Sequence, residues 1–221
     1  MTISPPLEST SILIRSKPGA ADALAGFLAG GAAAVQETEP QTLQWIAQRE
    51  GDDTFRIVDF FANDDGRQAH FAGQVAAALQ GQAPDLVAGG WDGGVVPNII
   101  NAQVLSSHVR DASTAPKPTL ACHIQLTARP GQEDALAAFL TAGAEIVRET
   151  EPGTLLWYAI RLDTSNFAIY DVFVDEAARD AHFAGHVAAA LHDSASTLVE
   201  GGWDDGVVNN VVHADILSLT Y

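Results

Sequence analysis

The sequence predicts an α+β protein built from a ferredoxin-like βαββαβ unit that occurs twice. The first observation is an internal repeat. A shift of 112 residues (His70 returns as His182) aligns Ile12–Ser106 with Ile124–Ser218 without a gap, and about half of the aligned positions are identical. The second is the order of patterns within each copy, which reads strand, helix, strand, strand, helix and strand. Together these observations predict two domains of one fold.

The duplication sets the expected domain boundaries in the 221-residue chain. We expect a first domain at residues 1–109, a linker at 110–118 and a second domain at 119–221. The linker sequence, Arg-Asp-Ala-Ser-Thr-Ala-Pro-Lys-Pro, is polar and contains proline, which is typical of a connection between domains. Each domain, at about 100 residues, has a common size for a single hydrophobic core.

Each copy begins with an expected strand, Ser11–Ser16 in the first and Cys122–Ala128 in the second, followed by a Pro-Gly turn. An amphipathic helix comes next, because apolar or small residues recur at i, i+3, i+4, i+7 and i+11. In the first copy these residues are Leu24, Phe27, Leu28, Gly31 and Val35. The sequence Glu-Thr-Glu-Pro then ends the helix, since the residue before a proline is pushed out of the α region.

Two strands at Thr42–Arg49 and Thr54–Ala62 are expected to form a β-hairpin across Gly-Asp-Asp. A second helix at Arg67–Leu79 follows, then a glycine-rich connection and a last strand at Ile99–Ser106. One face of the hairpin is identical in the two copies, and it carries Asp59 among aromatic side chains. Residues kept on one face in both copies suit packing on the helices of the same domain, or the lining of its own pocket.

Composition limits the classes of function. The formal net charge is −17, with 11 Lys and Arg against 28 Asp and Glu, which argues against nucleic acid or an anionic membrane as a partner. The lone cysteine, Cys122, excludes an intrachain disulfide and suits a reducing compartment. The start of the chain lacks the features of a signal peptide, and no apolar run approaches the roughly 18 residues of a membrane span. We therefore expect a soluble, cytoplasmic protein.

Asp59 and its counterpart Asp171 are candidate site residues, because an unpaired carboxylate is costly among aromatic side chains on a strand. In a symmetric hairpin Trp45 faces Asp59 directly, and Arg49 lies on the same face. One interpretation is a carboxyl group with a raised pKa that orients a substrate or a histidine. The other is a structural acceptor for the tryptophan N–H or the arginine.

Four motifs, in this order, resemble the antibiotic biosynthesis monooxygenase (ABM-like) superfamily. They are Pro-Gly before the first helix, Glu-Thr-Glu-Pro-x-Thr-Leu-x-Trp into the second strand, Asp-x-Phe ending the third, and Ala-His-Phe with its histidine nine residues beyond that Phe. The resemblance covers nearly the whole of each copy. Where the family usually has an acidic residue, any residue and then Trp, this sequence has Asp59-Phe60-Phe61.

The resemblance implies both a fold and a class of activity. In this superfamily two ferredoxin-like domains, usually from two chains, combine their sheets into a dimeric α+β barrel with the helices outside. The duplication then implies an intramolecular pseudo-dimer, which could also form a homodimer. Some members are cofactor-independent monooxygenases that oxidise quinols or polyketide aromatics, others cleave haem, and many have no established activity.

The leading hypothesis is a cofactor-independent monooxygenase that acts with O2 on a small aromatic or quinol-like molecule. His70 and His182 stand where the family often has a histidine near the cavity, and either could act as the base. Helical periodicity, however, places His70 about 125° from the centre of the apolar stripe of its helix, which favours a boundary histidine bonded to backbone or carboxylate. The alternative function is a non-catalytic protein of the same fold that binds a small apolar ligand or acts as a scaffold.

Further aromatic and polar residues would complete the substrate site. The expected apolar walls are Trp45, Trp157, Phe61, Phe173, Trp91 and Trp203. The last two tryptophans each follow Gly-Gly, and they could form an aromatic lid or instead plug an open edge of the sheet. Asn98 and Asn210 could donate to a bound carbonyl group.

Metal binding is the weaker interpretation of the histidines. His182 and His186 have the i, i+4 spacing that can hold a metal on one helix. The first copy has Gln74 at the second of these positions, and no third ligand is evident. We therefore expect neither a metal nor another cofactor.

Overall fold

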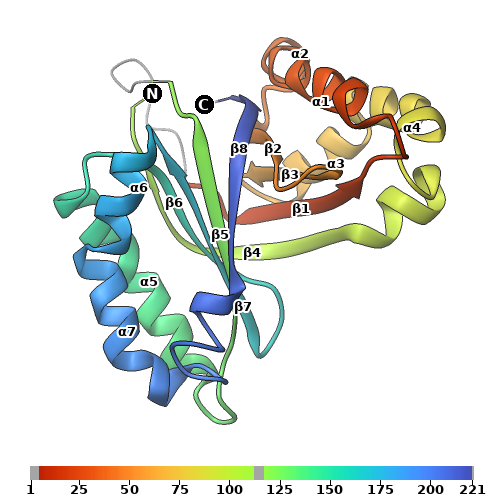
Figure 1. Cartoon of the computed structure of the whole chain (residues 1–221). Helices are drawn as coiled ribbons and strands as arrows, with labels where there is room; N and C mark the ends of the chain where they lie inside the picture. The colour runs from red at the N-terminus through yellow and green to blue at the C-terminus, as the bar shows by residue number, and fades with distance from the viewer. Residues whose placement is uncertain (1–4, 112–116, 221) are drawn as a thin grey trace. The chain divides into compact units, whose positions relative to one another are not determined.

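The structure, a computed structural model, describes residues 5–111 and 117–220 (Figure 1). The chain divides into two compact units. The described part of the first consists of residues 5–101 and 214–220, and that of the second of residues 102–111 and 117–213. Residues 112–116 of the expected linker lie outside the described residues.

The first unit contains a four-stranded antiparallel sheet in the order β1-β3-β2-β8. Its strands are β1 (Glu8–Arg15), β2 (Thr42–Arg49), β3 (Thr54–Phe61) and the later part of β8 (Val211–Leu219). Ala47 lies opposite Ser218, and the Trp45 N–H donates to Thr220 Oγ1 over 2.8 Å. β2 and β3 also pair with each other in antiparallel fashion, so the hairpin forms where the sequence predicts it.

The second unit repeats this sheet in the order β5-β7-β6-β4. Its strands are β5 (Leu120–Thr127), β6 (Thr154–Arg161), β7 (Asn166–Phe173) and the later part of β4 (Ile99–Val109). Here His108 of β4 lies opposite Trp157 of β6. The last strand of each sequence copy thus completes the sheet of the unit that holds the first three strands of the other copy.

Helices cover one face of the sheet in each unit (Figure 1). In the first unit they are α1 (Ala21–Ala29), α2 (Gly31–Thr38), α3 (Asp64–Phe71) and α4 (Gln74–Leu86). In the second they are α5 (Glu133–Thr150), α6 (Glu176–Phe183) and α7 (His186–Leu198). Short helical turns follow, η1 (Trp91–Val95), η2 (Val96–Asn98) and η3 (Val208–Asn210). The predicted α+β class, with βαββαβ order in each copy, is confirmed.

The prediction of a single helix at Arg67–Leu79 is wrong, because this segment forms two helices, α3 and α4. Gly73, between them, is extended with φ −84° and ψ 178°. A side chain there would lie 2.5 Å from Glu39 Oε1, so glycine leaves room for a carboxylate to reach the break. The Asn63 side chain starts α3 by accepting a hydrogen bond from the Gly66 N–H over 3.0 Å.

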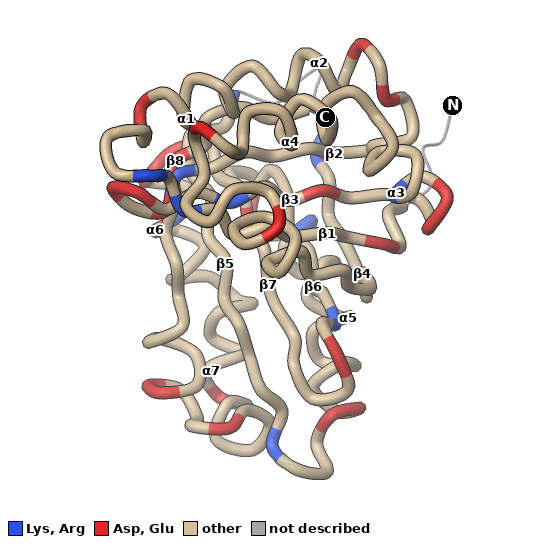
Figure 2. The backbone as a smooth tube through the Cα atoms, turned by 90° about the vertical axis from the view of Figure 1, so that its right-hand side faces the viewer, with Lys and Arg blue, Asp and Glu red and all other residues tan. Residues whose placement is uncertain are grey.

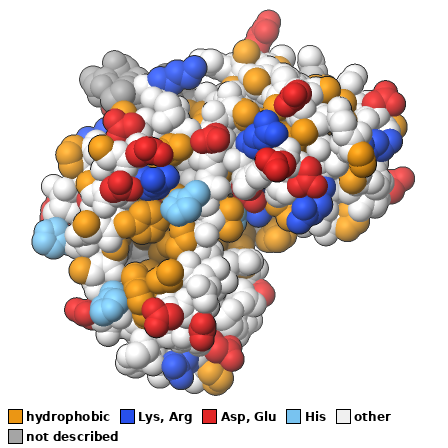
Figure 3. Space-filling view, viewed as in Figure 1, with side chains coloured by type: hydrophobic (Ala, Val, Ile, Leu, Met, Phe, Trp, Pro, Cys, Tyr) orange, Lys and Arg blue, Asp and Glu red, His pale blue; other side chains and the backbone are white. Residues whose placement is uncertain are grey.

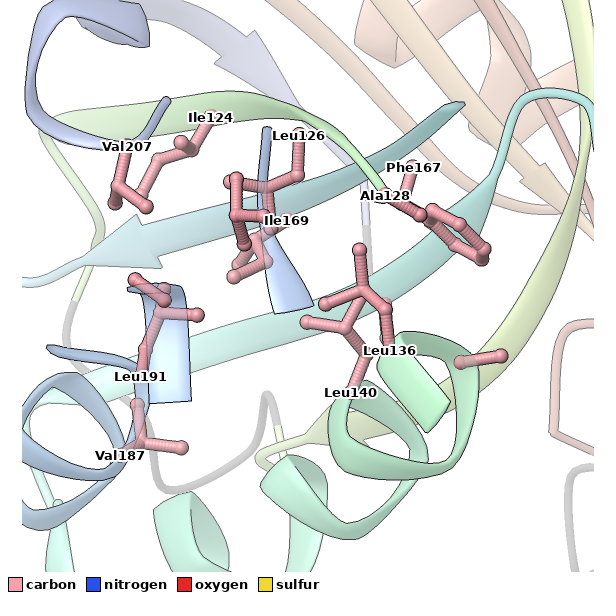
Figure 4. Packing of buried hydrophobic residues seen from close by; sticks show 14 of the residues in the cluster. Ile124, Leu126, Ala128, Leu136, Leu140, Phe167, Ile169, Val187, Leu191 and Val207 are labelled. Carbon is pink, nitrogen blue, oxygen red and sulfur yellow. The ribbon is translucent and has the colours of Figure 1, made fainter. Parts of the chain in front are cut away.

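The hydrophobic core of each unit lies between its sheet and its helices. Figure 4 shows Leu136 and Leu140 of α5 and Val187 and Leu191 of α7 on the helix side of this core in the second unit. They meet side chains of β5, β7 and the segment before η3, namely Ile124, Leu126, Phe167, Ile169 and Val207. Fully burying one such side chain contributes about 1.5–3 kcal/mol, so this layer is a main source of stability.

Most charged residues lie outside these cores, with Asp59, Asp171, Glu39 and Glu151 among the buried exceptions. Asp and Glu are spread over the helices and loops of both units, in keeping with the net charge of −17 (Figure 2). Within the described part of the chain, no helix has the length and apolar character needed to cross a membrane.

Candidate functional site

A buried histidine lies at the centre of each candidate site. His70 is on α3 and His182 on α6, and each side chain is only about 5% exposed. His70 Nδ1 lies 2.5 Å from Glu39 Oε2, and His182 Nδ1 lies 2.5 Å from Glu151 Oε2. An Nδ1–H that donates to a carboxylate fixes the tautomer and leaves Nε2 as the nitrogen that can take up a proton.

In the first unit the glutamate is held by the start of the next helix, whereas Glu151 Oε1 has no hydrogen-bond partner among the described residues. Glu39 follows the end of α2, and its Oε1 accepts a hydrogen bond from the Val75 N–H of α4 over 3.3 Å. The N-terminal end of a helix favours a negative charge, because its first N–H groups lack partners within the helix. Thr42 Oγ1 in the first unit (3.5 Å) and Thr154 Oγ1 in the second (3.1 Å) donate to the other oxygen of the respective glutamate.

The aspartate lies on the other side of the imidazole ring. Asp59 Oδ2 is 3.6 Å from His70 Nε2, and Asp171 Oδ2 is 3.7 Å from His182 Nε2. Both aspartates are fully buried. None of their carboxyl oxygens has a hydrogen-bond partner among the described residues. The imidazole therefore lies between one bonded carboxylate and one unbonded carboxyl group.

Burial changes how these groups hold protons. Removal from water raises the pKa of Asp59 to about 7, an increase that His70 opposes and Glu39 reinforces. The pKa of Asp171 is likewise raised to about 7. Burial alone would lower the pKa of His70, but the charge of Asp59 and the bond and charge of Glu39 outweigh it, so that pKa is raised. In each unit the histidine and the aspartate thus shift each other's pKa.

The register of the hairpin confirms that Trp45 faces Asp59. The tryptophan N–H nevertheless does not bond to the carboxylate, since the oxygens of Asp59 have no hydrogen-bond partner. Arg49 also bonds elsewhere, to the carbonyl oxygens of Gly51 and Asp52 at 2.9 and 2.7 Å. The geometry therefore does not support the interpretation of Asp59 as a structural acceptor for these two groups.

Each unit contains a cavity between sheet and helices, and its histidine lines it. The cavity of the first unit has a volume of about 360 Å³ and includes His70, Phe71 and Trp91 in its lining. That of the second has a volume of about 300 Å³ and includes His182 and Trp203. Figure 3 shows hydrophobic side chains gathered in a hollow between α7 and β5, with a histidine at its edge. Mostly apolar cavities of about 300 Å³ or more are typical sites for small ligands.

The predicted site residues fall into three groups. Those that line the cavities are His70, His182, Trp45, Trp157, Trp91 and Trp203. Those that lie next to the histidine without lining a cavity are Asp59, Asp171, Phe61 and Phe173, and the two phenylalanine rings lie 5.6 and 5.3 Å from their histidine rings. Asn98 and Asn210 do not line either cavity, because their side-chain amides donate to the carbonyl oxygens of Gly94 and Gly206.

The metal interpretation of His182 and His186 fails on geometry. His182 is near the end of α6, whereas His186 begins α7, so the two residues are not one turn apart on a single helix. In the described part of the chain, no group of three or more His, Cys, Asp or Glu side chains is arranged to hold a metal ion.

Glu39 and Glu151 are site residues that the sequence patterns did not predict. They are the second glutamates of the two Glu-Thr-Glu-Pro segments, which we interpret from sequence only as helix stops. Their burial, to 8% and 7% exposure, is unusual for glutamate and marks a specific role. The exact return of this motif after 112 residues is the signal that could have found them.

Comparisons with known proteins agree with this fold. Residues 119–194 match the antibiotic biosynthesis monooxygenase family. A candidate monooxygenase from Fusobacterium nucleatum is similar in structure, with a TM-score of 0.80 and 14% identity over 98% of this chain and 95% of that chain. A candidate monooxygenase from Lactobacillus acidophilus has a TM-score of 0.79 and 10% identity over 97% and 95% of the two chains. Among curated proteins, none matches the sequence.

A third solved structure, of an anthrone oxidase-like protein, has a TM-score of 0.60 and 12% identity over 99% of this chain and 95% of that chain. At such low identity, these three structures show a shared fold. The repeated βαββαβ order, with a cavity and a buried Glu–His–Asp group in each copy, defines a two-domain α+β protein of the dimeric α+β-barrel class. The second copy thus matches the antibiotic biosynthesis monooxygenase family over residues 119–194, and the chain as a whole shares the fold of these monooxygenase-like structures.

Proposed function

We propose that the protein is a cofactor-independent monooxygenase that acts with O2 on a small aromatic or quinol-like substrate. The observation that carries this proposal is a buried imidazole in the wall of an apolar cavity, bonded to Glu39 at 2.5 Å and facing Asp59 at 3.6 Å. The arrangement recurs around His182. The match of residues 119–194 to the antibiotic biosynthesis monooxygenase family supports the same class of reaction.

The cavity favours a flat apolar substrate. The lining of the first cavity includes the aromatic side chains of Trp45, Phe71 and Trp91. A volume of about 300–360 Å³ accommodates a molecule of two or three fused rings. The histidine of the Glu–His–Asp group is then the polar residue, present in both cavities, that recognises an acidic O–H or C–H of that molecule.

The histidine would act as a general base. In the neutral imidazole Nδ1–H donates to Glu39, and Nε2 takes the substrate proton. Both carboxyl groups stabilise the imidazolium that forms, which is why the pKa of His70 is raised and its basicity exceeds that of a free imidazole. His70 and His182 are thus the proposed catalytic residues, whereas Asp59, Asp171 and the two glutamates position them and tune their pKa.

The substrate anion would then reduce O2. For an activated ring CH2, the substrate gives up four electrons, one oxygen atom becomes its carbonyl group, and the other leaves as water with the two hydrogens. The substrate thus supplies all the electrons. A dry apolar cavity favours this step, because water would stabilise the anion and lower its reactivity.

Oxygen uptake tests the proposal. A panel of anthrones and hydroquinones is added to the purified protein in air and under argon, and both oxygen consumption and product are followed. The proposal predicts consumption that depends on the protein, with one atom of ¹⁸O2 in the carbonyl product of an anthrone. Tight binding of these compounds without any protein-dependent oxygen consumption would favour the alternative, a non-catalytic small-ligand-binding protein.

We also propose a cytoplasmic location, because the lone cysteine is a buried free thiol, which suits a reducing compartment.

A further inference from the structure

The two cavities differ in two polar residues, since Gln74 of α4 lines only the first and His213 lines only the second. His213, at the start of β8, belongs to the lining of the second cavity. The equivalent residue of the first copy, 112 positions earlier, is Asn101, which does not line the first cavity. The large apolar residues of the lining recur in both copies, for example Phe27 with Phe139 and Trp91 with Trp203. The second cavity therefore has two imidazoles where the first has one.

A cysteine on the neighbouring strand orients His213. Cys122 Sγ of β5 lies 3.0 Å from His213 Nδ1. The equivalent pair in the first unit is Thr10 and Asn101, whose side-chain oxygens lie 2.8 Å apart. His213 also meets the edge of the Phe183 ring, at 5.9 Å between ring centres, and that ring lines the same cavity.

The protons of this pair follow from its surroundings. Burial, reinforced by Asp171, raises the pKa of the Cys122 thiol to about 12, so the thiol keeps its proton and can donate it to His213 Nδ1. Burial and the neighbouring Arg179 lower the pKa of His213, with Asp180 opposing, so the imidazole is neutral at neutral pH. The proton of the neutral ring then resides on Nε2, which makes Nε2–H a hydrogen-bond donor.

We propose that His213 is a specificity-determining residue of the second cavity, which donates from Nε2 to a second oxygen substituent of an aromatic ligand. The second cavity thus prefers aromatics that carry two oxygen substituents, one for His182 and one for His213. The first cavity has its second polar side chain, Gln74, at a different position and none at the position of His213, so it does not share this preference. The inference rests on the proposed function only in assigning small aromatic molecules to the cavities.

Equilibrium binding under argon tests this without turnover. Ala76 and Ala188 are equivalent residues in the linings of the two cavities, so Ala76→Trp fills the first and leaves the second open. On this background, calorimetry compares 1-naphthol with 1,4-dihydroxynaphthalene. The variant His213→Asn introduces the residue of the first copy. We expect it to weaken binding of 1,4-dihydroxynaphthalene by roughly three- to tenfold, as for one lost hydrogen bond. Binding of 1-naphthol should change less than twofold.

Two further variants serve as controls. His213→Gln carries its amide donor on a side chain one methylene longer than that of Asn and should retain part of the preference for the diol, whereas Asn101→Ala on the Ala188→Trp background should alter neither affinity. The proposal is overturned if His213→Asn weakens both probes equally, if it weakens neither, or if Ala76→Trp binds neither probe. Since no oxygen is present, failure of the monooxygenase proposal would leave the ratio of the two affinities intact.

Discussion

His70 Nδ1 of α3 lies 2.5 Å from Glu39 Oε2, a residue that directly follows α2. The bond joins residues 31 positions apart in the sequence, and His182 and Glu151 repeat it at the same distance. Because a buried imidazole with one nitrogen bonded to a carboxylate has a fixed tautomer and orientation, this pair makes the opposite nitrogen available for proton transfer. The proposed chemistry depends on it in both units.

The glutamates should set the pKa of the histidines. We expect Glu39→Gln/Glu151→Gln to lower the pKa of His70 and His182, since an amide accepts the Nδ1–H bond but lacks the charge that raises the pKa. A histidine titration followed by NMR measures this directly. Glu37→Gln/Glu149→Gln is the matched control, because these exposed residues begin the same Glu-Thr-Glu-Pro segments. Equal histidine pKa values in the two double variants would refute the assignment.

The buried aspartates should make the protein less stable as pH rises. Their pKa is about 7 in the folded protein against 3.8 when exposed, so between these values the folded state binds more protons than the unfolded state. Stability associated with the protonated carboxyl is present below pH 4 and is lost as pH rises toward 7. The shift corresponds to about 4 kcal/mol per site. The pKa values of His70 and His182 are also raised, so these residues add a further loss of stability as the pH rises.

Urea unfolding between pH 4 and pH 8 checks this dependence. In the double variant Asp59→Asn/Asp171→Asn, the free energy of unfolding should fall clearly less between pH 4 and pH 8 than in the wild type, because the carboxyl groups that must ionise are gone. Asp92→Asn/Asp204→Asn removes the same number of charges from equivalent exposed positions and should decline like the wild type. A parallel decline in both double variants would show that the buried aspartates do not carry the effect.

The tryptophan at the base of each cavity requires a glycine opposite it. A Cβ at Gly31 would lie 2.3 Å from the Trp45 ring, and one at Gly143 would lie 2.7 Å from the Trp157 ring. We expect Gly31→Ala or Gly143→Ala to destabilise the protein by about 1–3 kcal/mol, since the large rings have little room to move. Thermal unfolding measures the change. Gly26→Ala, in α1 with no atom near its Cβ, should instead stabilise by roughly 0.5–1 kcal/mol.

Ligand stoichiometry should follow the two cavities separately. We expect the wild type to bind two molecules of 1-naphthol per chain, and either Ala76→Trp or Ala188→Trp to bind one, because each indole fills the cavity of its own unit. Calorimetric titration gives the number directly. A stoichiometry of one in the wild type, or no loss in either variant, would contradict the assignment of one site to each unit.

The order of the elements was predictable from the sequence because local patterns determine it. The hairpin was expected at Thr42–Arg49 and Thr54–Ala62, and it forms at Thr42–Arg49 and Thr54–Phe61. The return of the pattern after 112 residues also predicted the second copy. The exchange of β4 and β8 was not predictable, since a strand carries no signal for which of two nearly identical hairpins it joins.

The candidate site was predicted only in part, for a geometric reason. A continuous helix would have placed His70 away from the apolar stripe, but the break at Gly73 separates the two helices, and α3 turns His70 into the interior. The same break makes room for Glu39, which reaches across from the end of α2. Single-helix periodicity cannot reveal a partner that comes from another element.

Oxygen uptake by histidine variants tests the central claim most directly. His70→Gln and His182→Gln each remove the proposed base of one unit, and far-UV circular dichroism confirms that the variants remain folded. With an anthrone that the wild type oxidises, we predict that each single variant keeps the activity of the other unit. The double variant should lose at least about a hundredfold in rate, the usual contribution of a general base. Undiminished oxygen uptake in the folded double variant would contradict the account.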